Sequence, residues 1–179
     1  RCGETLAASL HGDCDPLQIL FPAGSVELAE GLNQKTPFAR YHNSVIGDAI
    51  AEVVAALPPG RRLRILEIGA GTGSTSSYVL PKLPADRTDY VFTDLSPLFT
   101  ARAAAKFREY PFVRYQIFDA EQDPGSQGMG PEQFDVVIAA NVIHATRDLR
   151  DTLSHVRQVL APRGLLILLE ATQVQRWVD

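Results

Sequence analysis

The sequence has few cysteines, no long apolar run and no strong excess of one charge, and each absence excludes a class of protein. Cys2 and Cys14 are its two cysteines, without a CxxC motif or a histidine-rich neighbourhood, so neither a disulfide scaffold nor a zinc site is supported. The net charge of −4 argues against nucleic acid or an anionic membrane as the main partner. No apolar run reaches the roughly 18 to 20 residues that span a bilayer, and the first residues lack the profile of a signal peptide. We expect a cytoplasmic protein that binds small molecules or other proteins.

The length and composition predict one domain with a smaller N-terminal segment. A chain of 179 residues that is 45% apolar can bury a sizeable core. We expect a helical or lid segment over residues 1–60 and an α/β core over residues 61–179. The chain begins at Arg1 rather than at methionine and ends at Asp179 shortly after an apolar strand, so we expect it to be a piece of a longer polypeptide.

The spacing of apolar residues predicts a parallel sheet covered by helices. Residues 1–40 carry no sustained period, which predicts irregular or short helical structure. From residue 43 to Leu57 apolar residues recur at helical spacing, with Asn43 placed to cap the helix and Pro58 beyond its end. Strand-like and helix-like segments then alternate, which is typical of a parallel sheet with helices on both faces. The predicted strands are residues 63–68, 90–93, 113–118, 134–140 and 165–170, and the predicted helices between them are residues 74–83, 97–109 and 149–160.

A glycine-rich turn follows the first predicted strand. Glycines at positions 69, 71 and 73 allow positive φ and let a ligand approach the backbone, and the next helix offers unpaired N–H groups. The dinucleotide fingerprint G-x-G-x-x-G would need a glycine at position 74, where Ser74 stands. The observed pattern is E-x-G-x-G-x-G, beginning at Glu67. It predicts a nucleotide-like cofactor at this turn.

Polar residues follow the other predicted strands, at the edge of a parallel sheet where ligands bind. Asp94 follows the second strand and is placed to accept hydrogen bonds from both hydroxyls of a ribose. Asp119 follows the third strand and is placed to accept from an adenine amino group. For either aspartate taken singly, capping of a helix or loop is the alternative. Their coincidence with the glycine turn favours cofactor binding.

The fourth and fifth strands end near a histidine and an acid. His144 follows the fourth strand, and Glu170 ends the apolar run 165–169, where an unpaired carboxylate is expensive to bury. If the two strands are neighbours, Glu170 can hold the imidazole in one tautomer, as a general base requires. A purely structural pair is the alternative. The sequence gives no such support to His11, His42 or His155, and His155 is expected on the surface.

Taken together, these motifs resemble the carbon-methyltransferase domain of a modular polyketide synthase. The resemblance is carried by the stretches LEIGAGTGSTSSYVLPKLP, FTDLSPLFTARAAAKFREYPFVRY, FDVVIAANVIHATRDLRDTL and LAPRGLLILLE. It implies a Rossmann-like α/β fold of the class I methyltransferases, with a parallel sheet flanked by helices and truncated after the fifth strand. It also implies S-adenosylmethionine (SAM) as cofactor, with a β-ketoacyl substrate held by phosphopantetheine on an acyl carrier protein, and neighbouring synthase domains as further partners.

The resemblance further implies the roles of individual residues. His144 would remove the proton from the substrate α-carbon, and Glu170 would orient His144. The substrate pocket could include Tyr41 and Asn43, although a helix-capping turn explains Asn43 equally well. The residues that would contact SAM are Glu67, Gly69, Ala70, Gly71, Gly73, Asp94, Leu95, Asp119, Ala120 and Asn141.

The resemblance leaves an exposed edge and several alternatives. Related domains continue the sheet beyond a fifth strand, so we expect the apolar run 165–169 to pair with another chain, to be covered otherwise, or to limit solubility, and we expect part of the pocket to be missing. A methyltransferase that acts on oxygen or nitrogen would have the same cofactor-binding residues. A catalytically inactive module of a synthase would share the fold. A nicotinamide oxidoreductase is disfavoured by Ser74.

Overall fold

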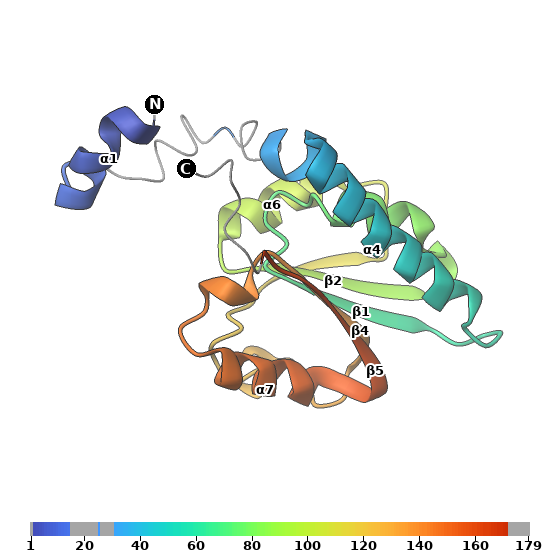
Figure 1. Cartoon of the computed structure of the whole chain (residues 1–179). Helices are drawn as coiled ribbons and strands as arrows, with labels where there is room; N and C mark the ends of the chain where they lie inside the picture. The colour runs from blue at the N-terminus through green and yellow to red at the C-terminus, as the bar shows by residue number, and fades with distance from the viewer. Residues whose placement is uncertain (1, 15–24, 26–30, 172–179) are drawn as a thin grey trace.

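The fold is a five-stranded parallel sheet with helices on both faces (Figure 1). The computed structural model describes residues 2–14, 25 and 31–171, so the predictions for residues 15–24, 26–30 and 172–179 lie outside the described residues. The strands are ordered β3-β2-β1-β4-β5, and every adjacent pair is parallel. Their bounds are β1 Leu63–Ile68, β2 Thr88–Asp94, β3 Val113–Ile117, β4 Phe134–Ala140 and β5 Leu160–Leu169. The predicted fold class is confirmed, and β4 and β5 are neighbours as the site requires.

The α-helices occupy the segments between strands and a region before the sheet. Helices α4 and α6 lie on one face of the sheet and α7 on the other (Figure 1). None of the described helices is long and apolar enough to cross a membrane. The α-helices are α1 Cys2–His11, α4 Pro37–Ala55, α5 Ser76–Val79, α6 Pro97–Lys106 and α7 Leu149–Val159; the shorter helical turns are η2 Gly31–Lys35, η3 Leu80–Lys82, η4 Ala85–Arg87, η5 Gly125–Gln127 and η6 Ile143–Ala145.

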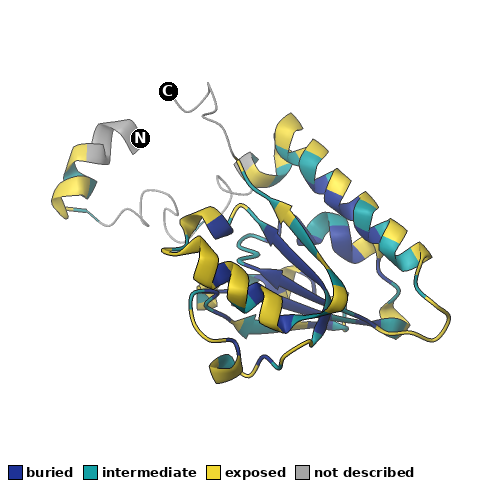
Figure 2. Cartoon of the chain, turned by 60° about the horizontal axis from the view of Figure 1, so that its bottom comes forward, coloured by how far each residue is buried: buried dark blue, intermediate teal, exposed yellow. Residues whose placement is uncertain are grey.

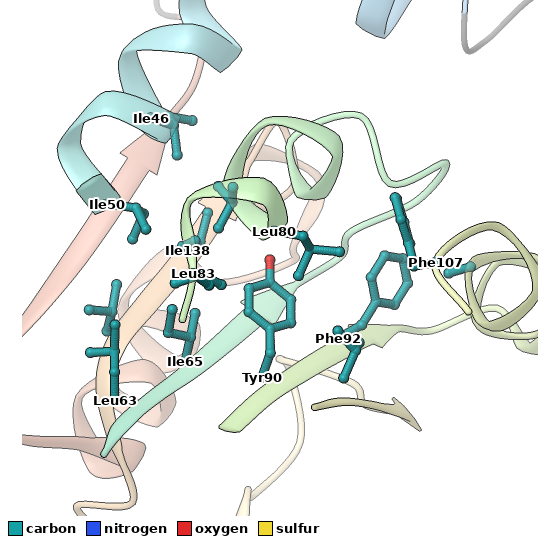
Figure 3. Packing of buried hydrophobic residues seen from close by; sticks show 14 residues of the cluster. Ile46, Ile50, Leu63, Ile65, Leu80, Leu83, Tyr90, Phe92, Phe107 and Ile138 are labelled. Carbon is teal, nitrogen blue, oxygen red and sulfur yellow. The ribbon is translucent and has the colours of Figure 1, made fainter. Parts of the chain in front are cut away.

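Side chains along each strand point alternately to the two faces of the sheet, and they build a separate core on each face. In β1, Leu63 and Ile65 face the cluster that also holds Ile46 and Ile50 of α4, whereas Leu66 and Ile68 belong to the cluster beneath α7 (Figure 3 shows the first cluster). The central strands are buried on both sides, and exposed residues concentrate on the outer surfaces of the helices (Figure 2). Each fully buried Leu or Ile side chain stabilises the fold by about 1.5–3 kcal/mol. The sheet is therefore a firm platform for the loops at its edge.

The start of the first long helix differs from the prediction. Helix α4 begins at Pro37, and its N-cap is Thr36, whose side-chain oxygen accepts a hydrogen bond from the Ala39 N–H at 3.2 Å. Asn43 lies in the middle of this helix and is buried, so its prediction as the cap is wrong. The apolar period does not extend over the first turns of α4, because those turns do not face the core. The Thr-Pro pair at residues 36–37 is the sequence signal that marks the start of the helix. The predicted end before Pro58 is confirmed.

Several further boundaries differ: β2 begins at Thr88 rather than at residue 90, and α6 ends at Lys106 rather than at residue 109. The helix predicted over residues 74–83 is α5 followed by the 3₁₀ turn η3, because Pro81 has no N–H with which to continue the helix. The last strand begins at Leu160, five residues before the prediction. Its pairing with β4 jumps from Phe134↔Leu160 to Val136↔Leu165, so a bulge lies in residues 161–164, which the prediction left between a helix and a strand. Leu165 and Leu168 on this edge strand are 43% and 48% exposed.

Candidate active site

The glycine turn joins β1 to α5 at the carboxyl edge of the sheet. Gly69, Gly71 and Gly73 all have positive φ, of 58°, 55° and 72°, as predicted. A Cβ at Gly69 would lie 2.2 Å from the Val142 side chain, and one at Gly73 would lie 2.5 Å from the Phe107 ring. A Cβ at Gly71 would instead meet nothing closer than 3.9 Å. Gly69 and Gly73 thus permit close packing, while Gly71 leaves space for a ligand to lie against the backbone.

Asp94 ends β2 directly beside this turn. One carboxylate oxygen accepts the Gly71 N–H at 2.9 Å, and the other accepts the Ser96 N–H at 2.8 Å. The side chain therefore supports the turn and also the start of α6, which fits the alternative of a loop cap. Each carboxylate oxygen keeps a second lone pair. A contact with ribose hydroxyls remains compatible with this geometry and stays a prediction, as does a contact with Leu95, which is 65% exposed next to it.

Asp119 and Ala120 lie beyond β3, next to Asp94 along the same edge. Phe118 N–H donates to Asp94 O at 3.2 Å, which joins the two strand ends. The Asp119 carboxylate accepts the Glu121 N–H at 2.9 Å, and Ala120 is buried. His155 of α7 is half-buried, and its Nδ1 donates to Ala120 O at 2.9 Å, so the prediction of a surface histidine is wrong. The amphipathic period of α7 could not reveal the contact with the loop at Ala120, because that loop comes from a distant part of the chain.

Glu67 is the acidic residue of the glycine motif, and its side chain lies in the core. It is 1% exposed, and one carboxylate oxygen accepts hydrogen bonds from the Ser76 hydroxyl at 2.5 Å and from the Tyr90 hydroxyl at 2.6 Å. Burial raises the pKa of Glu67 to about 7, and the two hydroxyl donors limit that rise. Glu67 therefore fastens α5 to β1 and β2 below the turn. Its side chain is not part of the cavity lining, and its predicted contact with the cofactor stays a prediction.

A cavity of about 840 Å³ lies between the glycine turn, the start of α4 and the end of β4. Of the predicted site residues it brings together Asn43, Gly69, Ala70, Gly71, Asn141 and His144. Among the residues that the structure describes, its lining does not include Tyr41, which is 65% exposed, nor the carboxylates Glu67, Asp94 and Asp119. The aspartates instead lie along the adjoining sheet edge. A partly open pocket thus lies beside an acidic sheet edge, an arrangement that suits an elongated ligand with a nucleoside end.

His144 and Glu170 meet at the rim of this cavity. One oxygen of the Glu170 carboxylate contacts His144 Nδ1. The other accepts the N–H groups of Val142 at 3.0 Å and Ile143 at 2.6 Å. The Glu170 side chain is 13% exposed and that of His144 is 58% exposed. The predicted contact is confirmed: the acid holds both the imidazole and the loop that carries it.

Asn141 sets the direction of that loop. Its φ of 54° is in the left-handed region, which asparagine tolerates better than most residues. Its N–H donates to Leu169 O at 2.7 Å, so the ends of β4 and β5 are joined immediately before His144 and Glu170. The chain then turns into η6, which carries the histidine. The pairing of two adjacent strand ends thus brings the base and its acid together.

Asn43 is part of the framework of the cavity. Its amide nitrogen donates to Asn33 O at 3.0 Å, and its amide oxygen accepts the Thr75 hydroxyl at 2.9 Å. It therefore ties the turn η2, helix α4 and the segment after the glycine turn to one another. Both ends of the amide are engaged within the protein, which explains its burial inside the helix.

The sequence prediction missed several residues of the cavity wall. Phe38 and His42 are four apart on α4 and lie on one face of it, and Phe99 comes from α6. A prediction that began this helix after Thr36 would have placed Phe38 and His42 on one of its faces. The cavity also includes Thr36, Ser74, Thr75 and Leu169. No group of three or more potential metal ligands occurs in the described part of the chain.

Comparisons with known proteins point to one family. The chain matches the methyltransferase domain family over residues 66–166. It is similar to the carbon methyltransferase CurJ, with 49% identity and a TM-score of 0.96 over all of this chain and 48% of that one. It is also similar to the trans-methyltransferase CalH, solved with SAH, with 34% identity and a TM-score of 0.78 over 99% of this chain and 48% of that one. A curated relative is polyketide synthase ThaG of Burkholderia thailandensis, 41% identical over 169 residues. The chain spans about half of those solved chains and 3% of that synthase.

Proposed function

Because this chain belongs to the methyltransferase domain family and is similar to carbon methyltransferases, we propose that it transfers a methyl group to the α-carbon of a β-ketoacyl chain during polyketide synthesis. SAM is the methyl donor. The acyl chain would be carried by phosphopantetheine on an acyl carrier protein, with neighbouring synthase domains as further partners. Residues 1–60 would form the lid of the site and residues 61–179 its core.

The observation that supports this most strongly is the way Glu170 holds His144. A carboxylate only accepts hydrogen bonds, so the proton of the neutral imidazole lies on Nδ1, facing Glu170. Nε2 is then unprotonated and is the atom that can accept a proton. The imidazolium formed afterwards is stabilised by the same carboxylate. His144 is therefore arranged as a general base at the rim of the cavity.

The chemistry of the substrate matches one base without a metal. An α-carbon between two carbonyls is acidic, so its C–H bond can break with the proton moving to His144 Nε2 and the electron pair moving into an enolate. SAM supplies an electrophilic methyl group on sulfur, to which the α-carbon bonds as the S–CH₃ bond breaks. Phe38, Phe99 and Leu169 make part of the wall apolar, and with both ligands bound such a wall would strengthen the attraction between opposite charges.

The residues present fit the methyl donor. The space above Gly71, which a Cβ would fill, admits a ligand against the turn at residues 69–71. Asp94 would hold the ribose, and Leu95, Asp119 and Ala120 would lie beside the adenine. Asn141 would contact the amino-acid end, close to His144.

The test is a methyl-transfer assay on the full chain, with SAM labelled in the methyl group and a β-ketoacyl thioester. We expect label on the α-carbon. His144→Ala should abolish transfer and leave SAM affinity intact in calorimetry, whereas Asp94→Ala should weaken SAM binding. Label on oxygen or nitrogen would indicate a different methyltransferase. SAM binding without any transfer would indicate an inactive module, and a large loss of SAM affinity in His144→Ala would show that His144 serves the cofactor.

A further inference from the structure

A second histidine, His42, lines the same cavity as His144 but comes from helix α4. Its Nδ1 lies 2.8 Å from Phe38 O, one helical turn earlier. Its ring centroid lies 4.0 Å from that of Phe38 and meets the ring of Tyr41 edge-on at 5.2 Å. These contacts hold the imidazole in one orientation on the helix. His42 is thus a fixed part of the cavity wall.

The hydrogen bond to Phe38 determines what His42 can offer a ligand. A carbonyl oxygen only accepts, so Nδ1 carries the proton of the neutral imidazole. Nε2 is then a hydrogen-bond acceptor, and it takes part in none of the hydrogen bonds found among the described residues. In the neutral form, His42 therefore gives the cavity an acceptor of fixed direction, separate from the base.

Four polar side chains near His42 in the wall already have hydrogen-bond partners within the protein. Asn43 is bonded to Thr75 and to the backbone of Asn33. The hydroxyls of Thr72 and Ser74 lie 2.9 Å apart and pair with each other. The remaining wall is largely apolar. Nε2 of His42 is thus an acceptor on the α4 side of the cavity that none of the hydrogen bonds among the described residues engages.

We propose that His42 binds the pantetheine arm of the substrate by accepting a hydrogen bond from the amide N–H nearest the thioester; this rests on the proposed function. In a β-ketoacyl thioester the carbonyl oxygens and the sulfur accept, and that N–H is the nearest donor. The amide nitrogen is five bonds from the α-carbon, or about 6 Å when extended. Because both histidines line one cavity of about 840 Å³, we expect the α-carbon to lie at His144 and the amide at His42.

The test compares two small substrates that differ in this one donor. The first is a β-ketoacyl N-acetylcysteamine thioester, and the second is its oxygen analogue, in which an ester oxygen replaces the amide N–H. Wild type should prefer the amide in kcat/KM by about 2- to 12-fold, the effect of one neutral hydrogen bond. His42→Phe should lose this preference, and His42→Gln should retain part of it because its amide oxygen also accepts. Calorimetry with SAM reports whether each variant is folded.

A matched control is Val45→Ala, on the same helix at a 49% exposed position outside the cavity lining, which should keep the wild-type preference. The inference alone is overturned if wild type is active but His42→Phe retains the preference. An equal loss of activity on both substrates is one such result, and it would indicate a role in chemistry or folding. A wild-type protein that binds SAM and methylates neither substrate overturns the proposed function as well.

Discussion

Replacing Glu170 by glutamine separates its two tasks, because its two oxygens have different partners. One oxygen accepts the N–H groups of Val142 and Ile143, and only an oxygen can occupy that position. The amide nitrogen of the glutamine must therefore face His144, where it donates to Nδ1. The neutral imidazole then carries its proton on Nε2, and this nitrogen can no longer accept one from the substrate.

The expected loss is that of a general base. Such a group contributes about 10²- to 10⁴-fold to the rate, which corresponds to about 3–5 kcal/mol in the activation free energy. We therefore predict that Glu170→Gln lowers kcat for methyl transfer by this factor. The loop keeps its acceptor, so the free energy of unfolding should fall by no more than about 1 kcal/mol, since a neutral acceptor replaces a charged one.

The assay combines methyl transfer with SAM calorimetry and thermal unfolding. Glu170→Gln should bind SAM as wild type does and unfold at nearly the same temperature. Glu170→Ala provides the contrast, because it leaves two N–H groups without their acceptor at about 1–3 kcal/mol each, so both activity and stability should fall. If Glu170→Gln keeps kcat within about threefold of wild type, well below the effect of a base, the tautomer argument is wrong.

Three further predictions concern the turn and its supports. Because burial raises the pKa of Glu67 from 4.5 to about 7, the folded state prefers its neutral form. The contribution of Glu67 to the free energy of unfolding is complete below pH 4.5 and is lost as the pH rises to about 7, by up to about 3 kcal/mol. Glu67→Gln should therefore flatten the dependence of the unfolding free energy on pH in denaturant titrations, and an unchanged dependence would contradict this prediction. Gly71→Ala should weaken SAM binding at least about tenfold in calorimetry at a cost of about 1–2 kcal/mol in stability, whereas Gly73→Ala should chiefly destabilise, by about 2–4 kcal/mol, because its Cβ meets Phe107. Asn43→Ala should lower stability by about 1–3 kcal/mol by leaving its partners unpaired, and an unchanged melting temperature would show that these bonds contribute nothing.

Local patterns predicted the sheet closely, because the strands are short apolar runs between glycine and proline signals. Strands β1 and β4 have the predicted bounds, and each of the other three contains most or all of its predicted residues. The starts of α4 and β5 were displaced, since the first turns of α4 lack the apolar period and β5 passes through a bulge. The period of apolar residues reveals the segments that face the core. It gives no signal for segments that do not face the core.

The chain by itself determined that a glycine turn, aspartates, His144 and Glu170 follow successive strands, and in a parallel sheet those positions gather at one edge. Only the tertiary structure decided how they are used there. It buried Glu67 under the turn, made Asn43 a framework residue, and divided the two oxygens of Glu170 between a loop and an imidazole. It also turned His42 toward the cavity. Such contacts join residues far apart in the chain, and their geometry depends on how helices pack on the sheet, which no local spacing encodes.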